Sequence, residues 1–313
     1  MEYDQFSAMN TLVQVAAQGE RQDLAQGFER VRQFVEQSEE RFSRFRETSE
    51  LTRLNRSTGG WFYASPEMFD LVKAALKMHN LTGGLFDPSV LSALRQAGYD
   101  RSMDEIQQKG VPSARTDWRW TPSHFAETGL DPETHAIFLP QGSQIDLGGI
   151  AKGWIAASAA EQLSQFTDAC AVSAGGDMAL LGLPTGEPAW EISLEDPLDP
   201  EEVMAIMKVP AGGLATSTVT RRQWQQDGQT RHHIIDPRSG EPANTHWLSV
   251  TVHAPSAVAA EVFAKALLIA GPAEVQTLLS RVSGLQYSAV DRYGVINGNL
   301  KVTEIGYAPT TTF

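Results

Sequence analysis

The first half of the chain contains apolar residues at the spacing of amphipathic helices. Between residues 22 and 45, apolar side chains recur at helical spacing with charged residues between them, which predicts a long helix. Ser65-Pro66-Glu67 is a typical helix start, and this second helix is expected to end at Gly83-Gly84. Residues 146–153, DLGGIAKG, open a further predicted helix that reaches Leu163.

Short apolar runs bounded by Gly, Pro and Asp predict strands. These runs are residues 9–17, the two arms of ACAVSAGGDMALLG (169–182), AWEISLEDP, VMAIMKVP, GGLATST and LSVTVHAP, with a last hairpin around Arg292-Tyr293-Gly294. Residues 100–125 are polar and rich in Trp, and we expect irregular structure there with one short strand at DWRW (117–120). Helices and strands follow one another without a regular βαβ rhythm, so the sequence predicts an α+β fold with mixed or antiparallel sheets and packed helices.

One predicted helix, AEVFAKALLIAG (260–271), is apolar nearly all round and is therefore expected to be buried. It carries Glu261 and Lys265, which are four residues apart and lie on one face of the helix. An ordinary helix-stabilising pair of this kind contributes only about 0.2–0.5 kcal/mol. Because buried charges are costly unless they are paired or used, we favour a functional role for these two side chains.

The composition is that of a globular protein, with 42% hydrophobic and 20% charged residues in a chain of 313 residues, enough for one large domain or two smaller ones. The formal net charge of -13 argues against binding to a nucleic-acid backbone, whereas a small anion needs only a local patch. The single cysteine, Cys170, excludes an intrachain disulfide and is expected to be a small buried apolar residue. No run is long enough for a transmembrane segment and the N-terminus has no leader pattern, which predicts a cytoplasmic protein.

Three short motifs are candidates for binding an anion. In DLGGIAKG, free backbone N–H groups, the helix dipole and the ammonium of Lys152 can meet one negative group. In SAGGD (173–177), Gly175-Gly176 allows the backbone to approach a ligand closely. In HHIIDPRSG (232–240), one of two adjacent histidines is expected to point inward as an acid, a base or a phosphate contact. Singly, the first two are more simply tight turns and the third is equally a structural histidine, but together they suit an enzyme acting on a phosphorylated ligand.

Eight segments follow one another along nearly the whole chain: MNTLVQV, FSRFRETSELTRLNR, TGGLFDPSV, IDLGGIAKGW, SAGGDMALLG, LATST, HHIIDPRSGEP and SVTVHAPSAVAAEVFAKALLIAG. This series resembles the ApbE family of FAD:protein FMN transferases. The resemblance implies a single ApbE-like domain over residues 1–313, with two closely packed lobes and the flavin site between them. It also implies an enzyme that moves FMN from FAD to a Thr or Ser of an acceptor protein, in a family whose members are often exported.

The resemblance further implies a set of FAD contacts. Carried over motif by motif, they are Met9, Thr11, Phe86, Asp87, Ala151, Lys152, Gly175, Gly176, Asp177, Thr216, Ser217 and His233. Asn10 stands where the family's opening strand has Gly. His233 is in addition a candidate catalytic residue.

The chain departs from the family in the charged helix. Family members hold Mg²⁺ with an Asp, a Thr or Ser four residues later, and the carbonyl of the Ala in Ile-Ala-Lys-Gly; the corresponding residues here are Glu261, Lys265 and Ala151. An ammonium cannot coordinate Mg²⁺ and, at roughly 4 Å, repels a cation by a few kcal/mol. The sequence therefore places the Mg²⁺ site in question and makes Glu261 and Lys265 candidate catalytic residues.

Three hypotheses follow from this departure. The first is a transferase in which Lys265 stands in for the metal ion. The second is a flavin-binding module without transfer activity. The third is an FAD pyrophosphatase that releases FMN and AMP.

Overall fold

The computed structural model describes residues 1–114, 116–121 and 124–304, and its contacts divide the chain into two compact units. Unit 1 consists of Met1–Glu36, Lys152–Arg221 and His246–Phe313. Unit 2 consists of Gln37–Ala151 and Arg222–Thr245. The first boundary between them falls within helix α1 (Arg21–Phe42). Each unit is assembled from segments that are distant in the sequence.

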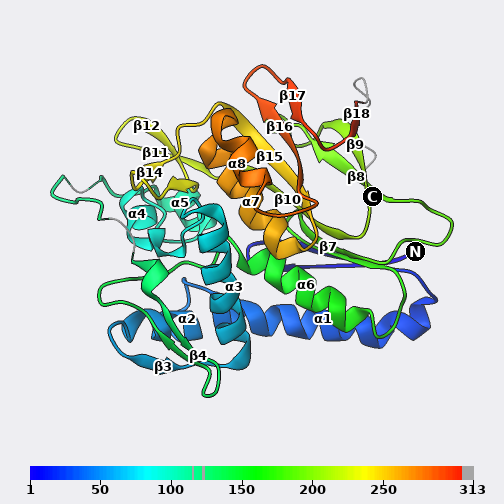
Figure 1. The fold of residues 1–313 in the computed structure, drawn as a ribbon, viewed down its shortest axis with the longest axis horizontal. Helices are drawn as coiled ribbons and strands as arrows, with labels where there is room; N and C mark the ends of the chain where they lie inside the picture. The colour runs from blue at the N-terminus through cyan, green and yellow to red at the C-terminus, as the bar shows by residue number, and fades with distance from the viewer. Residues whose placement is uncertain (115, 122–123, 305–313) are drawn as a thin grey trace. The chain divides into compact units, whose positions relative to one another are not determined.

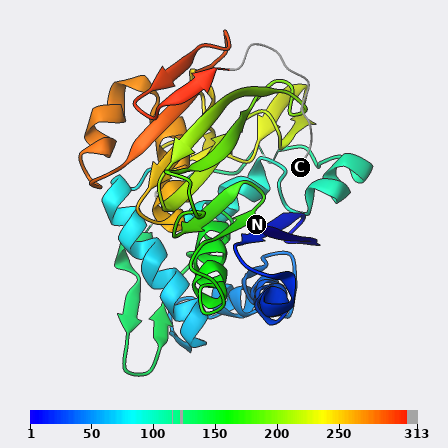
Figure 2. The same cartoon turned by 90° about the vertical axis from the view of Figure 1, so that its right-hand side faces the viewer.

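An eight-stranded sheet organises unit 1, in the order β1-β2-β6-β7-β10-β15-β16-β17 (Figures 1 and 2). Its strands are β1 (Glu2–Ala8), β2 (Thr11–Ala17), β6 (Cys170–Ala174), β7 (Asp177–Leu181), β10 (Gly212–Thr218), β15 (Trp247–Ala254), β16 (Gln286–Asp291) and β17 (Ile296–Gly298). Each neighbouring pair is antiparallel. Within the described residues this sheet therefore has none of the parallel pairing that a βαβ fold requires.

The first hairpin of this sheet was only half predicted. β2 matches the predicted strand at 9–17, but β1 was missed, although it pairs with β2 along its whole length, from Glu2 opposite Ala17 to Ala8 opposite Thr11. The loop between the strands is Met9-Asn10, with φ of 53° and 56°. Two-residue hairpin loops favour positive φ at both positions, and Asn tolerates this conformation well, which explains why Asn10 can stand where Gly was expected.

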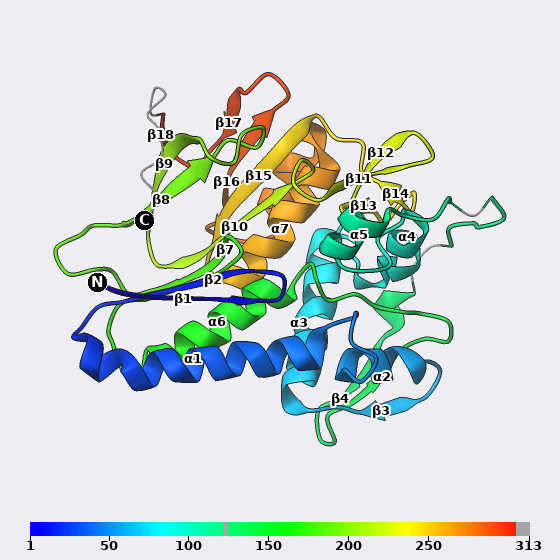
Figure 3. The same ribbon diagram turned by 180° about the vertical axis from the view of Figure 1, so that it is seen from behind.

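Helices pack against the large sheet and against one another in unit 1. α7 (Ala257–Ala270) lies along β10 and β15, followed by the 3-10 turn η3 (Pro272–Glu274) and α8 (Val275–Leu279) (Figures 1 and 3). α6 (Ala151–Leu163) lies beside the part of α1 that belongs to this unit, where the rings of Phe34 and Trp154 are 6.1 Å apart. As predicted, α7 is a buried helix, since even Glu261 is only 3% exposed.

A second, smaller sheet in unit 1 has the order β18-β9-β8. Its strands are β8 (Trp190–Glu195), β9 (Val203–Val209) and β18 (Val302–Glu304). Trp190, Leu194 and Met207 from this sheet pack with Leu180 and Leu214 of the large sheet in one buried cluster. The strands predicted at AWEISLEDP and VMAIMKVP are therefore confirmed, and their apolar sides are buried together.

Unit 2 combines short helices with small sheets. Its helical elements besides the end of α1 are α2 (Glu50–Arg56), α3 (Pro66–Thr82), η1 (Pro88–Val90), α4 (Leu91–Gln96), α5 (Met103–Lys109) and η2 (Phe125–Glu127). Its strands are β3 (Trp61–Tyr63), β4 (Gly129–Asp131), β5 (Ala136–Phe138), β11 (Gln223–Gln226), β12 (Gln229–His232), β13 (Ile235–Asp236) and β14 (Glu241–Pro242). Helix α3 begins and ends as predicted: Ser65 Oγ accepts the N–H of Met68, and Gly83 ends the helix with φ of 65°.

The predicted α+β class with antiparallel sheets and packed helices is confirmed, and one local prediction is wrong. Residues 117–120 do not form a strand, and within the described part of 100–125 the regular elements are α5 and η2. The helix at 103–109 was missed because only Met103 and Ile106 are buried along it, too few for a visible period. Its start is fixed by Ser102, whose hydroxyl accepts the N–H of Glu105. No helix in the described residues is long and apolar enough to cross a membrane.

The packing of α7 on β10 requires a glycine at position 213. A Cβ on Gly213 would collide with backbone atoms of Ser256 and Ala257, and Gly213 does not need a positive φ. We expect Gly213→Ala to lower the free energy of unfolding by about 1–3 kcal/mol, because backbone cannot move aside as a flexible side chain can. Gly60→Ala is the matched control, since its nearest neighbour, Ser57 O, lies 3.6 Å from the added Cβ. Equal urea-denaturation midpoints for the two variants would contradict this packing.

Candidate functional site

One end of the large sheet in unit 1 brings together several of the residues expected to contact FAD. β2 begins at Thr11, β6 ends at Ala174 and β7 begins at Asp177. The first residue of β2 and the glycine turn between β6 and β7 therefore lie side by side. β10 continues beyond Leu214, its last residue that pairs with β7, so Thr216 and Ser217 lie at the same end of the sheet. The topology therefore brings motifs that are separate in the sequence to the same end of the sheet.

The turn between β6 and β7 is shaped by its two glycines. Gly175 has φ of 63°, its N–H donates to Leu12 O at 3.0 Å, and a Cβ on it would collide with the side chain of Thr11. Gly176 has φ of 92° and open space where a Cβ would point. Thr11 and the glycine turn are thus in direct contact, and the turn leaves room for another molecule on the side of Gly176.

Directly after the glycines, at the first residue of β7, a charged pair links the sheet to α6. Lys152 Nζ forms an ion pair with Asp177 Oδ2, and the Asp177 side chain is only 3% exposed. Lys152 lies in the first turn of α6, where the free N–H groups of the helix also concentrate positive potential. The Lys of the IAKG motif and the acid of the GGD motif are therefore partners.

Glu261 of α7 is held by the same helix terminus. Its Oε2 accepts the N–H of Gly153 at 2.7 Å, across 108 positions of sequence. Gly153 permits this contact, because a Cβ there would lie 2.6 Å from Ala257 O and 3.1 Å from Glu261 Oε2. Glu261 therefore serves as a side-chain cap for α6 and fixes the distance between α6 and α7.

Lys152, Asp177, Glu261 and Lys265 form what we call the charged cluster. Burial, and next the charge of Asp177, raise the pKa of Glu261 to about 7, while Lys152, Lys265 and the Gly153 N–H oppose this rise. Lys265 is half-buried, one turn further along α7. Glu261 and Lys265 are thus part of a larger arrangement with two acids and two bases, rather than an isolated pair on one helix.

The charged cluster does not suit a divalent cation. Mg²⁺ is held by oxygen ligands, mainly carboxylates and water. In the cluster, one carboxylate is bound to a lysine and the other accepts a backbone N–H, with two ammonium groups nearby. Elsewhere in the described residues there is also no group of three or more His, Cys, Asp or Glu that could hold a metal ion. Ala151, the remaining predicted ligand, is the buried first residue of α6 and adds at most a carbonyl.

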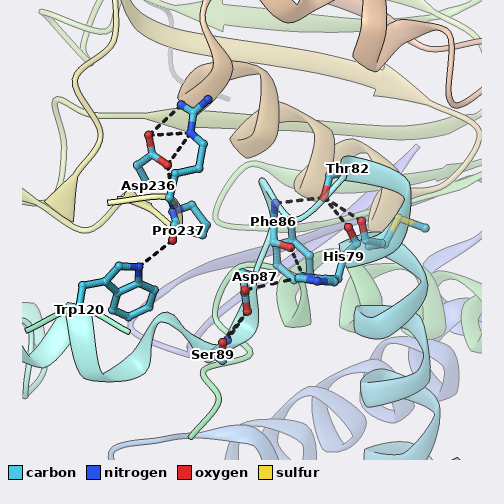
Figure 4. A network of polar contacts seen from close by, with 10 residues as sticks. His79, Thr82, Phe86, Asp87, Ser89, Trp120, Asp236 and Pro237 are labelled. Carbon is cyan, nitrogen blue, oxygen red and sulfur yellow. Dashed lines mark hydrogen bonds and ion pairs between the residues drawn. The ribbon is translucent and has the colours of Figure 1, made fainter. Parts of the chain in front are cut away.

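Phe86 and Asp87 lie in a network of polar contacts in unit 2 (Figure 4). The Phe86 side chain belongs to the core, at 3% exposure, and its backbone N–H and C=O bond to Thr82 Oγ1 and His79 Nδ1 at 3.1 and 3.0 Å. Asp87 is also buried, and its Oδ1 accepts the N–H and the hydroxyl of Ser89. These residues shape the turn after α3, and their contact with a flavin stays a prediction.

The two adjacent histidines have different surroundings. Burial lowers the pKa of His232, whose ring nitrogens lie 3.2 Å from Ala243 O and 3.3 Å from the N–H of Ile234. These contacts fix His232 as a structural residue. His233 instead faces an aromatic ring, with its centroid 6.4 Å from that of Tyr99.

The turn after the histidines is held by a tryptophan from the 100–125 segment. Trp120 Nε1 donates to Pro237 O at 2.9 Å, and a Cβ on Gly240, which has φ of 71°, would strike the Trp120 ring (Figure 4). Asp236 closes the same turn by accepting the N–H and the guanidinium of Arg238. Trp120 therefore fixes the loop that follows His233, a role that the sequence did not indicate.

An aromatic cluster beside His233 was also missed. Tyr99 stacks on Trp224 with ring centroids 5.4 Å apart, and the guanidinium of Arg44 lies 4.5 Å from the Tyr99 centroid and 4.2 Å from that of Phe45. Phe45 is 45% exposed and presents its ring to solvent. The FSRF segment had marked the chain's resemblance to a family, but only the fold shows that its Arg and Phe lie close to Tyr99.

A sequence profile of the ApbE family matches residues 9–288. The chain belongs to the ApbE family. Among the curated relatives, the FAD:protein FMN transferase of Vibrio cholerae serotype O1 is 31% identical over 241 residues, covering 76% of this chain and 71% of the relative. That of Escherichia coli strain K12 is 26% identical over 278 residues, covering 85% and 77% of the two chains.

The fold agrees with solved structures of ApbE proteins. The crystal structure of the Thermotoga maritima ApbE protein superposes with a TM-score of 0.79 at 25% identity, covering 95% of this chain and 96% of that chain. The flavin transferase ApbE from Vibrio cholerae gives a TM-score of 0.73 at 23% identity, again covering 95% and 96%. The ApbE match spans the sequence from Met9 to beyond Lys265, and so includes every predicted site residue.

One cavity in unit 2 is not part of the predicted ApbE site. It measures about 570 Å³ and is lined by Gln37, Glu40, Arg41, Thr48, Glu50, Arg53, Tyr63, Ala64 and Ser65. Its central groups are bound to one another: Glu50 accepts the N–H and hydroxyl of Ser65, and Arg41 pairs with Glu50. We assign this cavity no role in binding FAD.

The Lys152–Asp177 pair leads to a stability prediction. Lys152→Met removes one cation and leaves Asp177 and Glu261 buried together. We expect the free energy of unfolding to fall by about 2–4 kcal/mol, because an uncompensated buried carboxylate remains. The double variant Lys152→Met/Asp177→Asn should lose clearly less. Chemical denaturation of the unaltered protein, of Lys152→Met, of Asp177→Asn and of the double variant checks this, and a loss in the double variant equal to the sum of the two single losses would rule out the coupling.

Cys170 gives a second prediction. The residue is buried and free, as expected, and its burial raises the pKa of the thiol to about 11. At about pH 8 only roughly one thiol in a thousand is then ionised. A thiol reagent should therefore react slowly with the native protein and fully after unfolding in denaturant. Rapid stoichiometric labelling of the native protein would contradict the buried position.

Proposed function

We propose that this chain binds FAD and transfers its FMN moiety to a Thr or Ser of an acceptor protein. The observation that carries the proposal is the ApbE family match over residues 9–288. The curated relatives, with similarity over most of both chains, bear the name FAD:protein FMN transferase. The arrangement at the end of the large sheet supports the same function, because a glycine turn, a helix N-terminus and lysines are suited to a pyrophosphate.

The reaction is a phosphoryl-type transfer without oxidation or reduction. The hydroxyl oxygen of the acceptor forms a bond to the phosphorus on the FMN side of the pyrophosphate. The bridging P–O bond breaks, AMP leaves with the electron pair, and the hydroxyl proton passes to a base. Such a reaction depends mainly on positioning and on stabilising negative charge, so the protein needs fixed cations and N–H donors more than a nucleophile of its own.

The residues divide into groups by the work we assign to them. We propose that Gly175, Gly176 and the first turn of α6 with Lys152 bind the phosphates, and that Thr216 and Ser217 add hydroxyl contacts at the same end of the sheet. His233 is the proposed base or acid. The remaining proposed FAD contacts are Met9, Thr11, Phe86, Asp87, Ala151 and Asp177.

The transfer is tested by mass spectrometry. The purified protein is incubated with FAD and an acceptor that carries an Asp-Gly-x-Ser/Thr-Gly-Ala/Ser-Thr segment, once with Mg²⁺ and once with EDTA. A mass increase of one FMN on the Ser or Thr, with release of AMP, is the expected result. FMN and AMP without labelled acceptor would instead indicate a pyrophosphatase, and stable intact FAD in both conditions would indicate a flavin-binding module.

The histidine pair offers a matched test of the catalytic assignment. We expect His233→Gln to slow transfer by about 100-fold or more, the usual size of a lost acid or base, with little change in melting temperature. His232→Gln should have the opposite profile, because His232 holds the backbone at Ala243 and Ile234. Its melting temperature falls, and the rate of the folded protein changes less. The assignment fails if His233→Gln transfers FMN as fast as the unaltered protein.

A further inference from the structure

The charged cluster combines two acids and two lysines in a small region of unit 1. Asp177 and Glu261 are 2% and 3% exposed, and the Lys152 side chain is 21% exposed. Lys265 is half-buried on α7 and lies within the electrostatic reach of Glu261, as do Lys152 and Asp177. With all four groups ionised, the charges of the two lysines and the two acids sum to zero. A region of this kind does not draw in a divalent cation as an excess of carboxylates does.

The carboxylates of the cluster are already committed to protein groups. Asp177 forms the ion pair with Lys152, and Glu261 accepts the N–H of Gly153 at 2.7 Å. A metal ion would have to break or share these contacts, and it would stand among two ammonium groups. Like charges so close together in a partly desolvated place repel strongly.

The ammonium groups have the properties that an anion needs. A lysine is a compact point charge with three donors, and it serves as a phosphate ligand in many sites. Asp177 holds the ammonium of Lys152 in place through their ion pair. Glu261 fixes α7 against the N-terminus of α6, so Lys265 is carried on a helix whose position relative to Lys152 is set by a hydrogen bond and a close glycine contact.

We propose that in this chain Lys265, together with Lys152, neutralises the pyrophosphate of FAD in place of a divalent cation. Glu261 is a positioning residue in this arrangement, because it acts through α6 and the lysines. The inference rests on the proposed function, since it assumes that FAD is the ligand of the cluster. The inference concerns only which cations stabilise the phosphates. FAD and the acceptor hydroxyl remain the reactants of the transfer.

Binding of FAD without metal is the first test. The affinities of the protein for FAD and for riboflavin are measured by flavin fluorescence, in EDTA and in Mg²⁺. We expect the same FAD affinity, within about twofold, in both conditions. Lys265→Met should weaken FAD binding about tenfold or more while leaving riboflavin binding unchanged, because only FAD carries the pyrophosphate. An FAD affinity that depends on Mg²⁺, or an unchanged affinity in Lys265→Met, overturns the proposal.

A matched control and a reverse variant sharpen the test. Lys208 is an exposed lysine of β9 that pairs with Glu191, and Lys208→Met removes the same charge from unit 1 away from the cluster. It should bind FAD as the unaltered protein does, and an equal loss of affinity would mean that net charge alone is responsible. Glu261→Asp/Lys265→Thr supplies oxygen ligands in place of the ammonium. We expect FAD binding by this double variant to become stronger with added Mg²⁺, and no response to Mg²⁺ counts against the proposal.

The transfer assay separates this inference from the proposed function. Labelled acceptor in EDTA, at a rate within about twofold of that in Mg²⁺, supports both. Labelled acceptor only with Mg²⁺ supports the transferase and overturns metal-free neutralisation. If no acceptor is labelled in either condition, the transferase proposal fails, and the binding measurements still decide whether Lys265 neutralises the pyrophosphate.

Discussion

The hydrogen bond between the Gly153 N–H and Glu261 fixes the geometry on which the unit 1 site depends. It joins the N-terminus of α6 to the middle of α7 at 2.7 Å, and only a glycine at position 153 allows the two helices to come so near. α7 is in turn packed on β10 and β15. This contact therefore sets the position of α6, which carries Lys152, relative to α7, which carries Lys265.

Much of the local structure could be predicted, because its causes lie within a few residues. The capping Ser65 with Pro66, and Gly83 at the other end, specify α3 by themselves. The glycine pair 175–176 between two apolar runs specifies the β6–β7 hairpin, since positive φ is required at both glycines. The family was likewise evident from short motifs, several of which contain a backbone turn, such as the Met9-Asn10 loop and the Gly175-Gly176 turn.

The relations between distant segments could not be predicted in the same way. Glu261 looked like one half of an i,i+4 pair on its own helix, but the hydrogen bond that holds it goes to a residue 108 positions away. Trp120 lies in a polar segment without period, and its partner is a carbonyl 117 positions away. Arg44 and Tyr99 meet only through the fold. In each case the sequence supplies a side chain able to make the contact, and the tertiary structure selects the partner.

The buried acids of the site are best understood through the lysines that they hold. A chain with a formal net charge of -13 repels an anionic ligand at long range, so a phosphate site in it needs a strong local source of positive potential. Asp177 forms an ion pair with Lys152, and the Gly153 N–H holds Glu261 of α7 against the N-terminus of α6. The acids thus hold Lys152 and the two helices in place, and the same arrangement that favours a phosphate opposes a divalent cation.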